Sequence, residues 1–170
     1  MSRTKNLSER NEYDFYTTPE WCYESLEFPF HLFKHAHEPC RGDGRIVSFL
    51  QDKGMKVTST EIREGKDFFN WDGETELILT NPPFTLAQEF VEYSLERAKC
   101  VVMLLRVNFL GSLKRYDFWK ENKPDAMYVL SKRPSFTGKG TDATEYAWFV
   151  WQREEFVKPG IYHVKPPEKK

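Results

Sequence analysis

The feature that most limits how this chain can fold is a run of six apolar residues, CVVMLL, at residues 100–105. A run this short and this uniformly apolar is typical of a central parallel strand that is buried on both faces. Short apolar runs and amphipathic helical runs alternate on either side of it, which predicts an α/β sheet built from βαβ units. The 170 residues are enough for one well-cored domain and too few for two.

The expected elements follow this alternation. Besides residues 100–105, strands are predicted at residues 34–38, 56–62, 77–80, 126–130 and 145–152, and helices at residues 44–53, 86–98 and 116–122. The last two strands are expected to form the antiparallel edge of the sheet. The folded domain is predicted at residues 13–157, between a polar N-terminal arm at residues 1–12 and a C-terminal tail at residues 158–170.

Composition excludes several classes of protein. The net charge of −1 is not that of a protein that holds DNA by bulk electrostatics, so any basic surface has to be local. The three cysteines are far apart and form no C-x-x-C pair, which indicates a reducing compartment and no structural zinc. The four histidines have no recognisable ligand spacing, and there is no signal peptide or membrane-spanning run. These features predict a cytoplasmic protein without a metal.

The first motif that suggests chemistry is E-P-C-R-G-D-G at residues 38–44, between a predicted strand and a predicted helix. Glycines there let the backbone approach a ligand closely and open a helix N-terminus toward it. About twenty residues later Glu61 ends the next strand, where a carboxylate can hold the hydroxyls of a ribose. Val47 stands where a dinucleotide fingerprint has its third glycine, so an adenosyl ligand without a pyrophosphate fits better than NAD. The alternative is a glycine-rich turn.

The second motif is N-P-P-F at residues 81–84, directly after the apolar strand L-I-L-T. Two prolines fix the backbone angle φ and lack N–H groups, so the loop is stiff and presents carbonyl oxygens outward. Asn81 adds an amide oxygen, and Phe84 adds a flat apolar face. Two acceptors beside a flat surface can grip an amino group on a planar ring. The alternative is a rigid turn that only ends the strand.

The order of these motifs resembles that of the N6-adenine DNA methyltransferases, and most of all their small phage-borne members. The matching segments are F-Y-T-T-P-E-W at residues 15–21, E-P-C-R-G-D-G at 38–44, T-E-I at 60–62, K-D-F-F at 66–69, N-P-P-F at 81–84, and R-P-S-F-T-G-K-G-T-D at 133–142 followed by E-Y-A-W-F-V-W. The resemblance covers nearly the whole predicted domain. The chain departs from the family in having no separate target-recognition domain. We therefore expect either a permissive enzyme or one that takes its specificity from a partner in a homodimer.

The resemblance implies a Rossmann-like class I methyltransferase fold, with a mostly parallel seven-stranded sheet, an antiparallel edge strand and helices on both faces. It implies S-adenosylmethionine as cofactor and DNA as substrate, with Asn81, Pro82, Pro83 and Phe84 as the catalytic loop. The residues it implies for the cofactor are Tyr16, Thr18, Pro19, Glu38, Pro39, Cys40, Gly42, Gly44, Glu61, Ile62, Asp67, Phe68 and Asn81. Those expected to contact nucleic acid are Phe84, Lys114, Arg115, Lys132, Arg133, Phe136 and Lys139.

Three other functions remain open at this stage. Protein glutamine methyltransferases also carry N-P-P followed by an aromatic residue, and a side-chain amide is likewise a planar, conjugated nitrogen. Adenine in RNA would fit the same pocket as adenine in DNA. A phage module that only binds S-adenosylmethionine would share the fold, although it would have no use for an amine-gripping loop.

Overall fold

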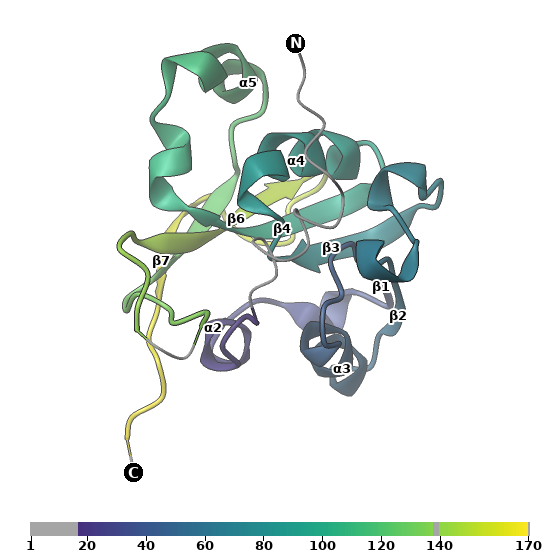
Figure 1. The fold of residues 1–170 in the computed structure, drawn as a ribbon, viewed down its shortest axis with the longest axis horizontal. Coiled ribbons are helices and arrows are strands. Elements are labelled where there is room, and N and C mark those ends of the chain that lie inside the picture. Colours follow the sequence, from purple (N-terminus) through teal and green to yellow (C-terminus); the bar gives the residue numbers. More distant parts are fainter. Residues whose placement is uncertain (1–16, 138–139, 170) are drawn as a thin grey trace.

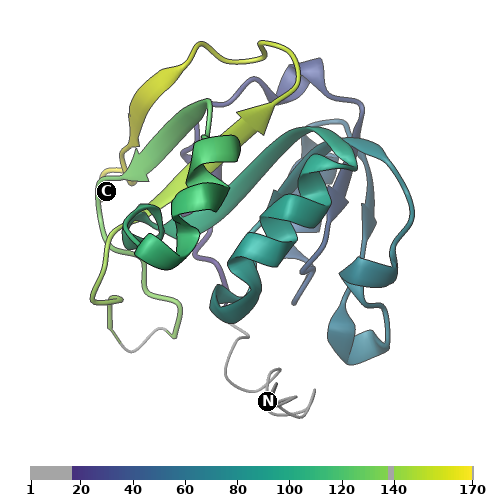
Figure 2. The ribbon, with the colours of Figure 1, turned by 90° about the horizontal axis from the view of Figure 1, so that it is seen from above.

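The computed structural model describes residues 17–137 and 140–169. The predicted N-terminal arm and two predicted site residues, Tyr16 and Lys139, lie outside these ranges. The strands of the sheet are β1 (His35–Glu38), β2 (Lys56–Ser59), β3 (Thr75–Thr80), β4 (Ala98–Arg106), β5 (Ala126–Leu130), β6 (Tyr146–Gln152) and β7 (Gly160–Val164). Their spatial order is β2-β1-β3-β4-β6-β5-β7, a single seven-stranded sheet that Figures 1 and 2 show from two directions.

The pairing confirms the predicted fold class and corrects one detail. Strands β2, β1, β3 and β4 run parallel, β6 is antiparallel to both β4 and β5, and β5 and β7 are parallel. The reversed strand β6 therefore lies inside the sheet, whereas an antiparallel strand was expected at its edge. Local patterns predict strands but do not specify which neighbour each strand pairs with.

The predicted C-terminal tail is also wrong in part, because β7 occupies residues 160–164 of it. The three prolines and the charged end of residues 158–170 suggested a tail. The exposed edge of β5 offers unpaired N–H and C=O groups, and β7 pairs with that edge over five residues. Tyr162 of β7 also stacks on Tyr128 of β5, with ring centroids 4.8 Å apart, so the sheet gains both hydrogen bonds and aromatic contact.

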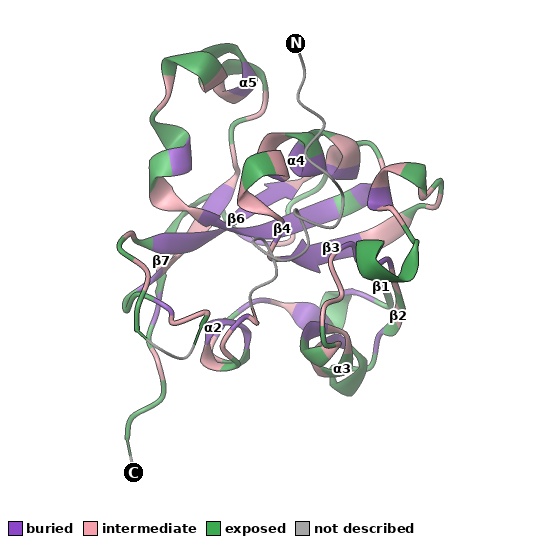
Figure 3. Cartoon of the chain, in the orientation of Figure 1, coloured by how far each residue is buried: buried purple, intermediate pink, exposed green. Residues whose placement is uncertain are grey.

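The two faces of the sheet bury two separate cores. Along β4, Cys100, Val102 and Leu104 belong to one core. Val101, Met103 and Leu105 belong to the other, as expected from the two-residue period of a strand. The first face is covered by α2 (Trp21–Glu24) and α3 (Arg45–Asp52), and the second by α4 (Ala87–Leu95) and α5 (Tyr116–Glu121). Figure 3 shows β4 and β6 buried almost throughout, which confirms the central strand predicted at residues 100–105.

Short 3-10 helices fill several connections between these elements. They are η1 (Phe30–Leu32), η2 (Ile62–Glu64), η3 (Phe68–Asn70), η4 (Phe84–Leu86), η5 (Val107–Leu110) and η6 (Leu113–Arg115). The strand predicted at residues 56–62 ends earlier, at Ser59, because the Glu61 side chain caps η2 by accepting the Arg63 N–H. None of the helices in the described residues has the length and apolar character needed to cross a bilayer.

Three of the four residues of strand β1 are buried although its sequence, H-A-H-E, is polar. His37 is fully buried, and its ring stacks on the Trp71 indole with centroids 3.8 Å apart. Its Nδ1 and Nε2 atoms lie 2.7 Å and 3.3 Å from the hydroxyl oxygens of Thr58 and Thr60. Burial lowers the pKa of His37 to about 4, so the ring is neutral near pH 7 and is compatible with a core position.

Candidate active site

The two predicted motifs meet because of the strand order. The glycine loop follows β1, the N-P-P-F loop follows β3, and these strands are parallel neighbours with Ala36 opposite Leu77. The carboxyl ends of parallel strands lie at the same edge of a sheet, which is where open α/β folds bind ligands. Motifs about forty residues apart in sequence therefore lie side by side, as the order of the elements predicted.

A small open hollow, here called the loop pocket, lies at this edge. It is lined by Thr17, Thr18, Cys40, Arg41, Gly42, Asp43, Arg45, Ile46 and Asn81. Four predicted site residues are among them: Thr18, Cys40, Gly42 and Asn81. The other five were not predicted, because the motif singled out the glycines and not the side chains beside them. The available signal was position: Thr17 precedes Thr18, Arg41 and Asp43 flank Gly42, and Arg45 and Ile46 begin α3.

The glycine loop has the backbone conformation that its sequence predicts. Gly42 and Gly44 have φ values of 57° and 86°, in the left-handed region that side chains disfavour. A Cβ atom at Gly44 would meet no atom within 4 Å, so the requirement there is conformational and not one of space. The loop closes through the Gly44 N–H, which donates to the Arg41 carbonyl at 3.0 Å, and it leads directly into α3.

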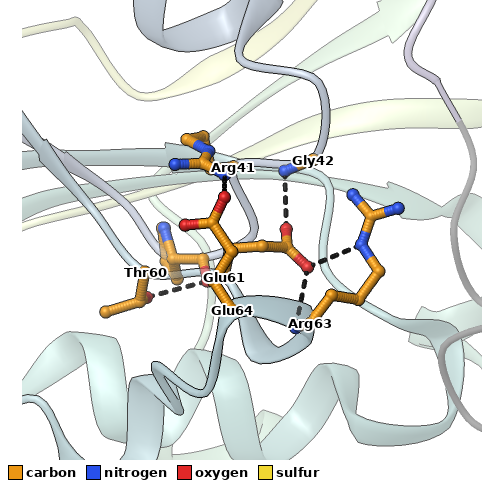
Figure 4. Close-up of polar contacts among 7 residues, drawn as sticks. Arg41, Gly42, Thr60, Glu61, Arg63 and Glu64 are labelled. Atoms are coloured by element: carbon orange, nitrogen blue, oxygen red, sulfur yellow. Dashed lines mark hydrogen bonds and ion pairs between the residues drawn. The ribbon is translucent and has the colours of Figure 1, made fainter. Parts of the chain in front are cut away.

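Glu61, the acidic residue predicted for the ribose, lies against this loop (Figure 4). Its Oε2 accepts a hydrogen bond from the Gly42 N–H at 2.8 Å. Its Oε1 accepts two, from the Arg63 N–H at 3.2 Å and from Arg63 Nε at 2.9 Å. Since each carboxylate oxygen can accept about two hydrogen bonds, Oε1 is saturated and Oε2 keeps one acceptor position. Glu61 is 6% exposed and joins the end of β2 to the glycine loop.

Glu38, also predicted for the cofactor, is buried beneath the loop and does not line the pocket. Its Oε1 accepts hydrogen bonds from the Cys40 N–H at 2.8 Å and from the Thr80 hydroxyl. Its Oε2 is buried and has no hydrogen-bond partner among the described residues. Burial, with the charge of Glu61 nearby as a weaker cause, raises the pKa of Glu38 to about 8. The side chain therefore ties β1 to β3 and to the loop, and it does so mainly in the protonated form at neutral pH.

Replacing Glu38 with glutamine is expected to change the pH dependence of stability. The carboxyl pKa rises from its ordinary 4.5 to about 8 on folding, so the unfolded chain holds fewer protons between these values and wild-type stability falls as pH rises through them. Glu38→Gln removes this loss. The free energy of unfolding of the variant, relative to that of the wild type, should rise by about 1–3 kcal/mol between pH 5 and pH 8. Urea unfolding at several pH values measures it.

The control is Glu89→Gln, which changes an exposed carboxylate on the first turn of α4. Its stability difference from the wild type should stay small and flat over the same pH range. If the stability difference between Glu38→Gln and the wild type also stayed constant with pH, the wild-type Glu38 carboxyl would not be buried in its protonated form.

The N-P-P-F loop presents acceptor atoms that the protein itself does not use. The Asn81 side chain donates from Nδ2 to the Thr18 hydroxyl oxygen at 3.1 Å. The Asn81 Oδ1 atom is buried and has no partner among the described residues. The Pro83 carbonyl accepts the Leu86 N–H at 3.1 Å, whereas the Pro82 carbonyl accepts no hydrogen bond within the described part of the chain. Two adjacent acceptors, Asn81 Oδ1 and the Pro82 carbonyl, are thus left for a ligand.

Phe84 is held by a cation above its ring. The Arg106 guanidinium lies 4.2 Å from the Phe84 ring centroid. Arg106 Nε donates to the Tyr146 hydroxyl at 3.1 Å, and this hydroxyl donates to Asp142 at 2.6 Å. The ring of Phe136 meets that of Phe84 edge-on, with centroids 6.5 Å apart and planes at 68°. Phe136 therefore lies beside Phe84, and the two rings do not form the parallel walls of a slot.

The other predicted cofactor residues within the described ranges do not line the pocket. Pro19, Pro39, Gly44, Glu61, Ile62, Asp67 and Phe68 belong to this group. Phe68 is 2% exposed and packs in the second core, so its ring is not accessible to a ligand. The Asp67 carboxylate caps η3 by accepting the Phe69 N–H at 3.0 Å. Burial of this kind depends on tertiary packing, which the short motif K-D-F-F does not encode.

The predicted nucleic-acid contacts differ in how far their charge is neutralised. Arg133 pairs with Glu145 at 2.8 Å. Lys114, Arg115 and Lys132 form no ion pair within the described residues. Within the described part of the chain, no group of three or more His, Cys, Asp or Glu side chains could bind a metal ion.

Comparison with solved structures assigns the fold class. A candidate RNA methyltransferase from Pyrococcus horikoshii matches with a TM-score of 0.58 at 12% identity, over 86% of this chain and 95% of that one. A candidate class I S-adenosylmethionine-dependent methyltransferase from Listeria monocytogenes matches with a TM-score of 0.53 at 11% identity, over 94% of this chain and 62% of that one. The chain therefore has the class I methyltransferase fold.

The sequence comparison points to the same class of protein. A type II methyltransferase of Mycoplasma genitalium is 29% identical over 90 residues, which are 49% of this chain. The match spans 28% of the length of that relative. No family model matches the sequence.

Proposed function

We propose that this protein transfers a methyl group from S-adenosylmethionine to the N6 amine of adenine in DNA. The observation that carries the proposal is the buried, unpartnered Asn81 Oδ1 beside the loop pocket. Leaving a buried acceptor unsatisfied costs about 1–3 kcal/mol, and the Pro82 carbonyl next to it is also unused. A site that only bound a cofactor would have no need of two free acceptors there. A site that binds an amino group needs both, one for each N–H.

The residues at the pocket fit an adenosyl cofactor with a charged amino-acid end. The left-handed glycines at 42 and 44 allow close approach of a ligand. Glu61 has an acceptor for a ribose hydroxyl, and Arg41, Asp43 and Arg45 line the pocket with charges of both signs. When bound, S-adenosylmethionine supplies a methyl group carried on a sulfonium sulfur.

The chain's own residues would activate the amine by positioning. The N6 lone pair of adenine is delocalised into the ring and is a poor nucleophile. Hydrogen bonds from the amine to Asn81 Oδ1 and to the Pro82 carbonyl would favour tetrahedral geometry at nitrogen and aim the lone pair at the methyl group. Transfer would exchange the carbon–sulfur bond of the bound cofactor for a nitrogen–carbon bond, and the surplus N–H proton would pass to solvent water. This chemistry relies on orientation and fixed dipoles and needs no covalent nucleophile.

The target base would reach the loop only after leaving a duplex stack. Phe84 is the ring proposed to stack on the base, and such base stacking contributes about 1–3 kcal/mol per base. DNA as the substrate is supported by the order of the sequence motifs and by the likeness of half the chain to a type II methyltransferase. Adenine in RNA and glutamine in a protein would fit the same acceptors.

The test is transfer of labelled methyl from S-adenosylmethionine to unmethylated DNA, RNA or protein, followed by nucleoside and amino-acid analysis. N6-methyladenine in DNA is the expected product. Label found only in RNA, or only in glutamine, would replace the substrate and keep the chemistry. Cofactor binding without transfer to any of the three would overturn the enzyme assignment.

A further inference from the structure

An apolar surface is concentrated in one short segment of the molecule. Six large hydrophobic side chains are exposed among the described residues, and three of them, Leu110, Leu113 and Tyr116, lie within one stretch of seven residues. Leu113 is 92% exposed and Tyr116 is 61% exposed. A leucine so far from any neighbour contributes nothing to folding stability, and a cluster of such side chains is a mark of an interaction site.

Two cations lie inside the same segment. Lys114 and Arg115 form no ion pair within the described part of the chain, in contrast to Arg106 and Arg133, which pair with Asp142 and Glu145. The Arg115 guanidinium stacks 4.3 Å from the centroid of the Phe109 ring, which keeps it on this surface. Apolar and aromatic side chains interleaved with unpaired cations match the base faces and phosphates of a nucleic acid.

The segment continues directly from the candidate active site. It begins after Arg106, the last residue of β4, whose guanidinium covers Phe84. In Figures 1 and 2, η5, η6 and α5 stand on the α4 side of the sheet and project beyond it. Trp119 of α5 fixes this projection by donating from Nε1 to the Phe109 carbonyl at 2.9 Å. The exposed side chains are therefore carried on a braced segment that starts directly after Arg106, the residue whose guanidinium covers Phe84.

We propose that this segment is the surface that opens duplex DNA, with Leu113 as a wedge that enters the stack beside the target adenine. Leu113 fills space that the adenine vacates when it turns toward Asn81, while Lys114 and Arg115 bind the flanking phosphates. The inference rests on the proposed function and adds to it that the substrate is double-stranded DNA. It also gives a role to a segment that the chemistry of methyl transfer does not use.

The experiment compares Leu113→Ala with the wild type on two DNA substrates of one sequence, a fully paired duplex and the single strand that carries the target adenine. The expected loss in kcat/KM on the duplex is about tenfold to a hundredfold, because the variant no longer offsets the cost of unstacking a base step. The loss on the single strand should be less than about twofold, because no base has to leave a stack. The matched control is Ile161→Ala, which removes another exposed side chain, 68% accessible, on β7; it should leave both substrates unaffected.

A second readout does not depend on turnover. With 2-aminopurine at the target position of the duplex, the wild type should raise the fluorescence on binding, and Leu113→Ala should raise it much less. If Leu113→Ala lost kcat/KM equally on duplex and single strand, or on neither, the wedge would be overturned. Methylation of DNA by the wild type would still support the proposed function. A wild type that methylates only single strands would also overturn the wedge. A wild type that methylates no DNA would overturn the proposed function itself.

Discussion

Replacing Asn81 with alanine is expected to lower the rate of methyl transfer by about a hundredfold or more, the usual cost of removing one preorganised polar group that acts in the transition state. The change removes the unpartnered Oδ1 that would accept a hydrogen bond from the amine, and it leaves only the Pro82 carbonyl in place. Binding of S-adenosylhomocysteine should largely survive, because the glycine loop and Glu61 are untouched. Single-turnover transfer rates and calorimetric binding measure the two effects separately.

The control for this change is Asn70→Ala, which alters an exposed asparagine in η3 outside the loop pocket. It should leave both transfer and binding unchanged. If Asn81→Ala lost cofactor binding and transfer together by the same factor, the N-P-P-F loop would be part of the cofactor site and not the group that activates the amine.

The fold could be predicted from the sequence where local pattern determines burial. The run at residues 100–105 identified the central strand, because a strand buried on both faces has no polar residues on either side of its two-residue period. Strand β7 could not be identified in the same way. Its residues face a core on one side and solvent on the other, and its stability comes from pairing with β5 and from the contact between Tyr162 and Tyr128. Such long-range pairing has no local signature.

The site could be predicted where topology alone brings groups together. The two loops follow neighbouring parallel strands, and Glu61 was expected near the glycine loop, to which it is bonded through the Gly42 N–H. The sequence could not predict that Glu38 is buried beneath the loop or that the ring of Phe68 is buried in the core. Whether a motif residue points into a pocket or away from it depends on the packing of α3 and α4, which the motif does not contain.

Replacing Glu61 with glutamine is expected to weaken binding of S-adenosylhomocysteine by about ten- to a hundredfold, since a hydrogen bond to a charged acceptor contributes about 1.5–3 kcal/mol. Glutamine keeps the size of the side chain but is neutral and has one oxygen, so its NH2 group would face either the two Arg63 donors or the Gly42 N–H and the ribose hydroxyl. Isothermal titration calorimetry measures the loss. Thermal unfolding of the unliganded variant checks that the loop is still anchored, and Glu89→Gln is the control for loss of one negative charge.

Arg63→Ala should act in the opposite direction from Glu61→Gln. Arg63 saturates Oε1 of Glu61 through its Nε and its own N–H, so a ribose that uses both carboxylate oxygens has to displace the guanidinium. The Arg63–Glu61 pair is partly exposed, and such pairs contribute about 0–1 kcal/mol; removing the side chain should therefore tighten binding up to about fivefold. Weaker binding in Arg63→Ala would mean that Arg63 orients Glu61 for the ribose. Unchanged binding in Glu61→Gln would mean that Glu61 serves only to join β2 to the glycine loop.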